Sequence, residues 1–180
     1  MKILKEVKHE LAYIILNYFV CYIPIWVIRK LLYRLFGMKI GKGTRILMGT
    51  KINYPKHIII GDNTIINEWC YLDGRGGISI GSNVTIANYT KLITGFHDID
   101  DENFKYCESR IDVGNNVAIF ADSVVLAGAI INDGCVFSAK SLIRKGVYNK
   151  KGIYAGNPAK FIRSRRSKCE YIQFWPTIFR

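Results

Sequence analysis

Between Val113 and Tyr148, hydrophobic residues return at every sixth position without an insertion. The stretch divides into six phrases: VGNNVA, IFADSV, VLAGAI, INDGCV, FSAKSL and IRKGVY. The first residue of each phrase is apolar, and the fifth is small or β-branched: Val117, Ser123, Ala129, Cys135, Ser141 and Val147. Six apolar first residues in a row would arise by chance roughly one time in a hundred, so the period predicts a repeat fold.

Six residues make one short strand and a turn, and three such units predict one coil of a parallel β-helix. The first and fifth residues of each phrase then face one interior column, and Val113 stacks on Ile131 of the next coil. Glycine and asparagine in 114–116 and 132–134 supply the positive φ angles that tight corners need. The pattern therefore predicts an all-β fold that depends on the stacking of neighbouring coils.

The same period is found upstream, where phrases begin at Ile40, Ile60, Ile66, Ile80 and Ile86. Short interruptions at 54–55 and 72–77 predict a turn and a glycine-rich bulge. The longest interruption, 94–111, is largely polar and has no place in a regular coil. We expect it to project outward as a loop, which is where a rigid scaffold often carries its chemistry.

One domain with two appendages accounts for the 180 residues. Residues 1–36 are expected to form hydrophobic and basic helices, and 37–163 to form the β-helix with its loop 94–111. Residues 164–180 make a basic and aromatic tail.

The apolar run in the N-terminal segment extends from Leu11 to Ile28, but Asn17 and Pro24 interrupt it, so a membrane span is not favoured. A second helix is predicted from Pro24 to Gly37, with one apolar face and one basic face. The apolar face holds Ile25, Ile28, Leu32 and Leu35, and Arg29, Lys30 and Arg34 point away from it. Such helices, with the aromatic tail 171–175, predict peripheral contact with a membrane. The alternative is that they only cover the open end of the β-helix.

Net charge and cysteine content indicate the kind of partner and the redox environment of the protein. The net charge of +12 indicates an anionic partner, which could be nucleic acid, a phosphorylated small molecule or a lipid surface. Five cysteines without a CxxC pair, two of them at fifth positions of the repeat, indicate a reducing environment. No small-residue cleavage site follows the apolar run, so no secretory signal peptide is predicted. The expected location is cytoplasmic, at the inner face of the cell membrane if the helices bind lipid.

The outward loop contains one histidine, His97. Imidazole suits proton transfer near neutral pH, so His97 is the candidate general base, whereas His57 beside the turn is expected to be a solvated corner residue. A base of this kind needs an acceptor on its other ring nitrogen. Asp98 and a backbone carbonyl are both candidates.

The hexads, the loop sequence TGFHD (94–98) and the closing AGNPAKFIR (155–163) together resemble the hexapeptide-repeat acyltransferases, and most nearly the maltose, galactoside and polysaccharide O-acetyltransferases. The resemblance covers about 37–163. It implies a left-handed parallel β-helix, a homotrimer, and transfer of acetyl from acetyl-CoA to a sugar hydroxyl of a glycan acceptor, without a metal. It also implies that the active site lies between two subunits.

Carried over by position, the resemblance makes His97 the base and Asn67 an acceptor-binding residue, with Asp73 near a second one. It assigns the acetyl-CoA channel to six further residues: Ala121, Ala139, Arg144, Lys145, Lys160 and Arg163. Ala118 departs from the family, which often has tryptophan there, so packing beside the acceptor or the pantetheine arm is expected to differ.

Three other readings are open. A γ-type carbonic anhydrase shares the repeat but needs three histidine ligands, and one of the three histidines here, His9, lies in the N-terminal helix. A nucleic-acid-binding protein would use the basic run 163–168, which no recognised binding module accompanies. A xenobiotic or small free-sugar acetyltransferase of the same family would show the same motifs. The N-terminal helices favour a bacterial surface polysaccharide, or its lipid-linked precursor, as the acceptor.

Overall fold

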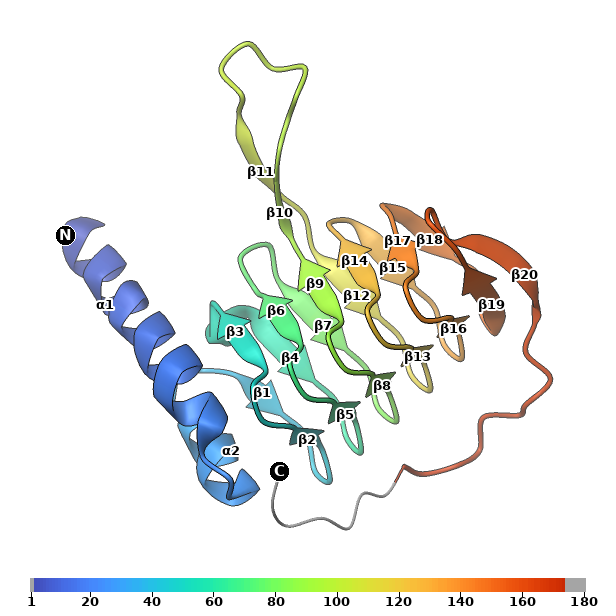
Figure 1. Cartoon of the computed structure of the whole chain (residues 1–180), viewed down its shortest axis with the longest axis horizontal. Coiled ribbons are helices and arrows are strands. Elements are labelled where there is room, and N and C mark those ends of the chain that lie inside the picture. The colour runs from blue at the N-terminus through green and yellow to red at the C-terminus, as the bar shows by residue number, and fades with distance from the viewer. Residues whose placement is uncertain (1, 174–180) are drawn as a thin grey trace.

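The computed structural model describes residues 2–173, and within them the strands wind into a parallel β-helix (Figure 1). The first sheet contains β1 (Lys39–Ile40), β4 (Ile58–Ile60), β7 (Ile78–Ile80), β12 (Ile111–Val113), β15 (Ala129–Ile131) and β18 (Gly146–Tyr148). The second contains β2 (Arg45–Ile46), β5 (Ile65–Ile66), β8 (Thr85–Ile86), β13 (Ala118–Ile119), β16 (Val136–Phe137), β19 (Gly152–Ala155) and β20 (Lys160–Ser164). The third contains β3 (Lys51–Asn53), β6 (Tyr71–Asp73), β9 (Lys91–Ile93), β14 (Val124–Leu126) and β17 (Leu142–Ile143).

The repeat sets the register between coils. Val113 pairs with Ile131, as the period predicts, and upstream Ile40 pairs with Ile60 and Ile60 with Ile80. The first residues of all six phrases are buried, because they form the interior column. The all-β prediction and the stacked coil are confirmed.

The sixth phrase departs from the prediction at its fifth residue. Val147 is 64% exposed, whereas its neighbour Tyr148 is buried and pairs with Ile131. The last coil is one residue shorter than the preceding one, so the strand alternation shifts and Tyr148 takes the interior position. A slip of one residue moves every side chain of a strand to the opposite face.

Buried hydroxyl groups satisfy the main chain at the corners. Thr64 Oγ1 donates to the Gly81 carbonyl at 2.8 Å and accepts the amide N–H of Val84 at 3.1 Å. The Thr44 hydroxyl accepts the amide N–H of Thr64 in the same way, one coil earlier. These fifth positions hold small polar residues because corner amides inside the column need a partner.

Two helical segments cover the open end of the first coil (Figure 1). The first comprises α1 (Lys2–Ile14), the π-helix η1 (Ile15–Phe19) and the 3₁₀-helix η2 (Val20–Tyr22); the second is α2 (Trp26–Leu35). A short 3₁₀-helix, η3 (Pro55–His57), precedes β4. No helix in residues 2–173 has the length and apolar character needed to cross a bilayer.

The buried side of the second helix is not its apolar stripe. Arg29 is fully buried, whereas Leu35 is 71% exposed and Ile28 is 43% exposed. The reason is the unpaired edge of the first coil, whose buried main-chain groups need partners. Arg29 Nη2 donates to the Ile46 carbonyl at 3.1 Å, so the basic side chain faces the column and the apolar face points away.

All five cysteines are unpaired, and burial raises the pKa of Cys70 to about 12. The Cys70 thiol is therefore uncharged at neutral pH and packs in the interior as a small side chain. Of the aromatic tail, Phe174 and Trp175 lie outside the described residues.

Candidate active site

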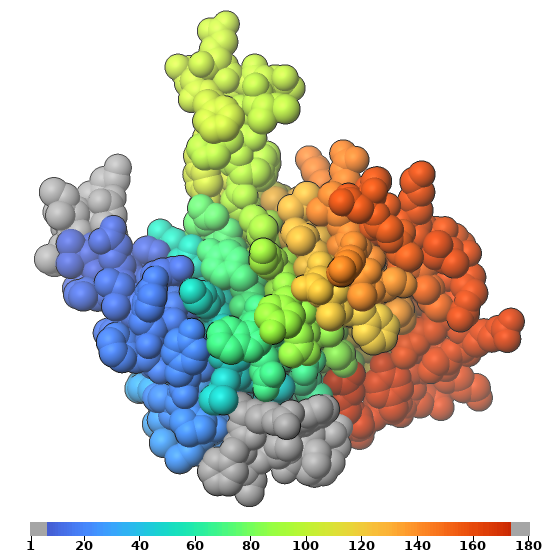
Figure 2. All heavy atoms as spheres, viewed as in Figure 1, coloured from blue at the N-terminus to red at the C-terminus, as the bar shows by residue number. Residues whose placement is uncertain are grey.

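The outward loop is a hairpin rather than an irregular segment. It leaves the column after β9 and returns at β12, and its arms are β10 (Gly95–His97) and β11 (Tyr106–Glu108), paired antiparallel. In the space-filling view the hairpin stands clear of the body (Figure 2). It extends from the corner between the third and first sheets, so His97 is held beyond the edge of its own column.

His97 is fixed by the hairpin itself. Its ring lies parallel to that of Phe104, with centroids 4.4 Å apart, and meets Tyr106 edge-on at 5.4 Å. His97 Nδ1 lies 2.7 Å from the Phe104 carbonyl oxygen. A carbonyl only accepts, so Nδ1 carries the hydrogen and Nε2 keeps its lone pair. Of the two acceptors predicted for the other ring nitrogen, the structure places a backbone carbonyl there.

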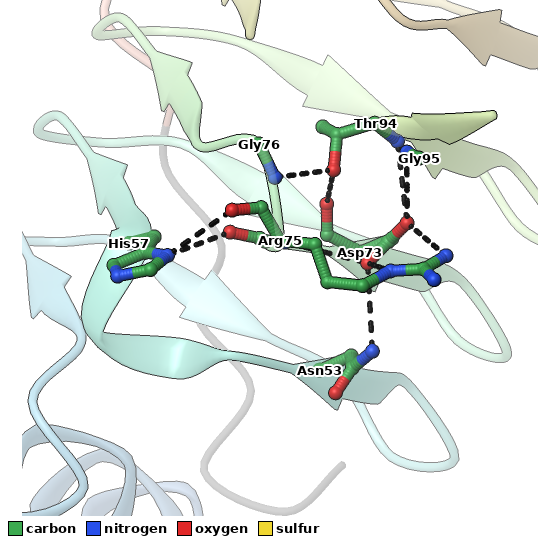
Figure 3. A network of polar contacts seen from close by, with 8 residues as sticks. Asn53, His57, Asp73, Arg75, Gly76, Thr94 and Gly95 are labelled. Carbon is green, nitrogen blue, oxygen red and sulfur yellow. Dashed lines mark hydrogen bonds and ion pairs between the residues drawn. The ribbon is translucent and has the colours of Figure 1, made fainter. Parts of the chain in front are cut away.

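A buried ion pair anchors the foot of the hairpin (Figure 3). Asp73, at the end of β6, is fully buried, and its two carboxylate oxygens accept from Arg75 Nε and Nη2, each at 2.8 Å. The same carboxylate accepts the amide N–H groups of Thr94 and Gly95, each at 3.3 Å. The Thr94 hydroxyl donates to the Asp73 carbonyl at 2.7 Å. These bonds join the corner after β6 to the first residues of the hairpin.

Burial alone raises the pKa of Asp73, but the bonds and charge of Arg75 and the amide of Gly95 outweigh it, so the pKa lies below its usual value. The carboxylate is therefore ionised at neutral pH. Because every partner named above lies at the corner or in the hairpin, the geometry favours a positioning role for Asp73.

Arg75 links this anchor to the histidine. Its guanidinium lies over the Tyr106 ring at 5.4 Å, and Tyr106 contacts His97. Gly95 makes this packing possible, because a Cβ there would lie 2.9 Å from Arg75 Cζ. A larger residue at this position of the TGFHD sequence would have to displace the Arg75 guanidinium.

A hollow of about 480 Å³ opens between α1 and the foot of the hairpin. Its lining combines aromatic, polar and charged side chains: His9, Glu10, Tyr13, Ile14, Asn53, Tyr71 and Arg75. Sequence reasoning missed these residues, although the glycines around Arg75 marked an unusual corner. The rest come together only because α1 packs beside β3 and β6.

The other predicted site residues form three groups, two at opposite ends of the third sheet and one on β20 of the second sheet. Asn67, Ala121 and Ala139 lie at the corner that precedes its strands, and Asn67 Nδ2 donates to the Ile86 carbonyl at 3.0 Å. Arg144 and Lys145 follow β17 at the corner that carries the hairpin, and both are exposed. Lys160 and Arg163 are exposed on β20. A single chain therefore does not bring Asn67 beside His97.

Among the residues that the structure describes, no three His, Cys, Asp or Glu side chains are grouped so as to hold a metal ion.

The structure is thus a stacked parallel coil with an outward hairpin that carries an exposed histidine. No protein-family model matches the sequence. The chain is 35% identical over 137 residues to the "Putative colanic acid biosynthesis acetyltransferase WcaF" of Escherichia coli, covering 76% of this chain and 75% of that protein. The chain belongs to the hexapeptide-repeat acetyltransferases, which confirms the family that the motifs indicated.

Solved structures of acetyltransferases share the fold of this chain. A maltose O-acetyltransferase from Clostridium difficile shares the fold, with a TM-score of 0.82 over 89% of this chain and 88% of that one, at 23% identity. A hexapeptide-repeat acetyltransferase from Vibrio cholerae, complexed with acetyl-CoA, gives a TM-score of 0.69 at 26% identity and covers 78% of each chain. The fold is the left-handed β-helix that the resemblance implied, and the chain is an acetyltransferase.

Proposed function

We propose that the protein transfers acetyl from acetyl-CoA to a sugar hydroxyl of a bacterial surface polysaccharide or its lipid-linked precursor, with His97 as general base. The observation that carries the proposal is the 2.7 Å contact between His97 Nδ1 and the Phe104 carbonyl, because it leaves Nε2 to take a proton. The relation to a protein named for colanic acid biosynthesis supports a polysaccharide acceptor.

The reaction needs one proton acceptor and no redox partner. The acceptor oxygen attacks the thioester carbonyl carbon while Nε2 of His97 takes the hydroxyl proton. The tetrahedral intermediate collapses with cleavage of the C–S bond, and the imidazolium returns its proton to the CoA sulfur. The products are the acetyl ester and free CoA thiol.

We place the acceptor in the hollow at the foot of the hairpin. Aromatic faces such as Tyr13 and Tyr71 suit sugar rings, and Asn53 and Arg75 offer hydrogen-bond donors to hydroxyl groups. Arg75 also contacts Tyr106 beside His97, so a sugar bound there would lie near the base.

We place the donor along two corners that belong to different copies of the chain. Ala121 and Ala139 form a smooth edge at one corner, and Arg144 and Lys145 supply charge for the CoA phosphates at the other. Lys160 and Arg163 on β20 extend this basic surface toward the nucleotide. Since Asn67 and His97 lie at opposite ends of the third sheet, the complete site needs two copies, as in the predicted homotrimer.

The native mass should therefore equal three chains. Flat, partly apolar flanks favour closed threefold assembly, and such an assembly would supply the second copy that the divided site needs. Sedimentation or light scattering at micromolar concentration measures the mass. A monomer that still turned over would contradict both the trimer and the shared site.

A panel of acceptors tests the reaction. Purified protein with acetyl-CoA should release CoA thiol with a lipid-linked or polymeric glycan, and the product should gain one acetyl ester by mass. Turnover confined to hydroxylated drugs or free sugars would support the alternative xenobiotic or small-sugar enzyme. Thiol release with no acceptor in the panel above the hydrolysis background would contradict the proposal.

A further inference from the structure

The two helical segments at the end of the column bury polar side chains as well as apolar ones against the first coil. Asn17 exchanges two hydrogen bonds with the main chain of Ile52, at 2.8 and 2.6 Å. Arg29 binds the main chain of Ile46, and Lys30 Nζ donates to the Gly41 carbonyl at 2.8 Å. These polar side chains form hydrogen bonds with main-chain groups at the open edge of the first coil.

The outward side of both segments is apolar. At 3.6 residues per turn, the residues opposite buried Leu16 and Val20 are hydrophobic without exception from position 11 onward. We name this surface the end face. It comprises Leu11, Ile14, Ile15, Tyr18, Phe19 and Tyr22 of the first segment, and Val27, Ile28, Leu31 and Leu35 of the second, each at least 41% exposed.

The end face points away from the column. Figure 1 places α1 and α2 beyond the first coil, so the side opposite the core faces outward along the column axis. Side-by-side assembly of columns uses their flanks and leaves this end uncovered. A trimer would present three copies of the end face on one side.

Positive charge is concentrated in the part of the chain that forms the helical segments and the first coil. Residues 1–57 contain eleven Lys or Arg and two Glu, a net charge of +9 out of +12 for the whole chain. Exposed members on the helices and the first coil include Lys8, Arg34, Lys39 and Lys42. Basic residues close to an anionic bilayer are attracted by its negative surface potential.

We propose that the end face binds the surface of an anionic lipid bilayer, with both helical segments lying in the interface. Apolar and aromatic side chains would enter the headgroup boundary while the surrounding lysines and arginines meet lipid phosphates. A second copy of the chain fits poorly, because end-to-end contact would bring two strongly positive surfaces together. The proposed lipid binding does not depend on the identity of the acceptor. A bilayer on the end face would also bring the hollow beside α1 close to the membrane, where a lipid-linked glycan would be presented.

Liposome flotation of the full-length protein tests the surface. We expect the protein to float with vesicles of 30% phosphatidylglycerol in phosphatidylcholine, and not with phosphatidylcholine alone. High salt should reduce binding, because the attraction is partly electrostatic. Failure to float with the anionic vesicles would overturn the proposal.

A variant on the end face tests whether lipid binding needs the apolar side chains as well as the positive charge. Changing Leu11, Ile15, Leu31 and Leu35 to Gln keeps helix propensity and should weaken binding by more than about tenfold. The matched control is Ile99→Gln with Val147→Gln, two residues that are 81% and 64% exposed on the hairpin and the last coil. It should bind like the natural sequence.

The same variant distinguishes the remaining outcomes. Unchanged flotation, or the loss of an end-to-end dimer of assemblies instead of lipid binding, would overturn the proposal. Turnover of a water-soluble acceptor should persist in the four-Gln variant, because none of its positions lines the hollow. Loss of flotation with retained turnover would therefore support the membrane surface independently of the proposed reaction.

Discussion

His97→Ala should lower kcat by about 10²–10⁴-fold, the range by which a positioned general base accelerates proton transfer. Without the imidazole, the proposed acceptor of the hydroxyl proton is lost as the sugar oxygen attacks the thioester. Affinity for CoA should persist, since the proposed phosphate contacts lie on β17–β20. Steady-state kinetics with the best acceptor of the panel, and equilibrium binding of CoA, measure the two effects separately.

His57→Ala is the matched control. This histidine is also exposed and contacts main-chain carbonyls of the glycine-rich corner, with Nδ1 3.2 Å from those of Gly74 and Arg75, but it lies outside the hairpin and the hollow. Its kcat should stay close to the natural value. In the natural enzyme turnover should fall at acid pH, because an imidazolium cannot accept a proton. Retention of more than about a tenth of kcat by an intact His97→Ala assembly would exclude His97 as the base.

Arg75→Met should destabilise the protein by about 3 kcal/mol, toward the low end of the cost of breaking a buried ion pair. The expected cost follows from the difference in burial between the two partners. The Asp73 side chain is fully buried, whereas that of Arg75 is 33% exposed. Removing Arg75 leaves a buried carboxylate without its main partner. Removing the charge in Asp73→Asn leaves an arginine that can reach water, so its cost should be smaller.

The two variants should also differ in their response to pH. Because the pKa of Asp73 is lowered in the folded protein, its contribution to stability is present at neutral pH and is lost as pH falls through that lowered value. The penalty of Arg75→Met should therefore shrink in acid, where the unpaired carboxylate takes a proton. Asp73→Asn has no group to titrate at this position, so its own stability should lose this pH dependence, and its penalty relative to the natural protein should also shrink in acid.

Thermal unfolding measures the stability of both variants, and about 3 kcal/mol corresponds to roughly 10 °C in Tm for a chain of this size. Displacement of the hairpin should also reduce kcat by about 10- to 100-fold, since small misplacements of a catalytic group are costly. An Arg75→Met protein with natural Tm and kcat would show that the ion pair does not position the hairpin.

Much of the architecture is determined by local sequence. The six-residue period fixes strand length, the position of each corner and the pairing of Val113 with Ile131, because every coil repeats the same short-range requirement for buried side chains. A break as long as 94–111 has no room inside a coil and projects from the column. The sequence alone therefore located the hairpin and its histidine, and the motifs around them indicated the family.

Features that depend on contacts between distant residues were decided only by the tertiary structure. The Phe104 carbonyl reaches His97 because the hairpin closes in one register, and Asp73 is buried because the chain returns above it at Thr94. Helix periodicity gave two faces for the second helix but did not decide which of them meets the column. The unpaired main chain of the first coil selected Arg29 for the inside, because a buried polar group without a partner costs more than leaving leucine exposed.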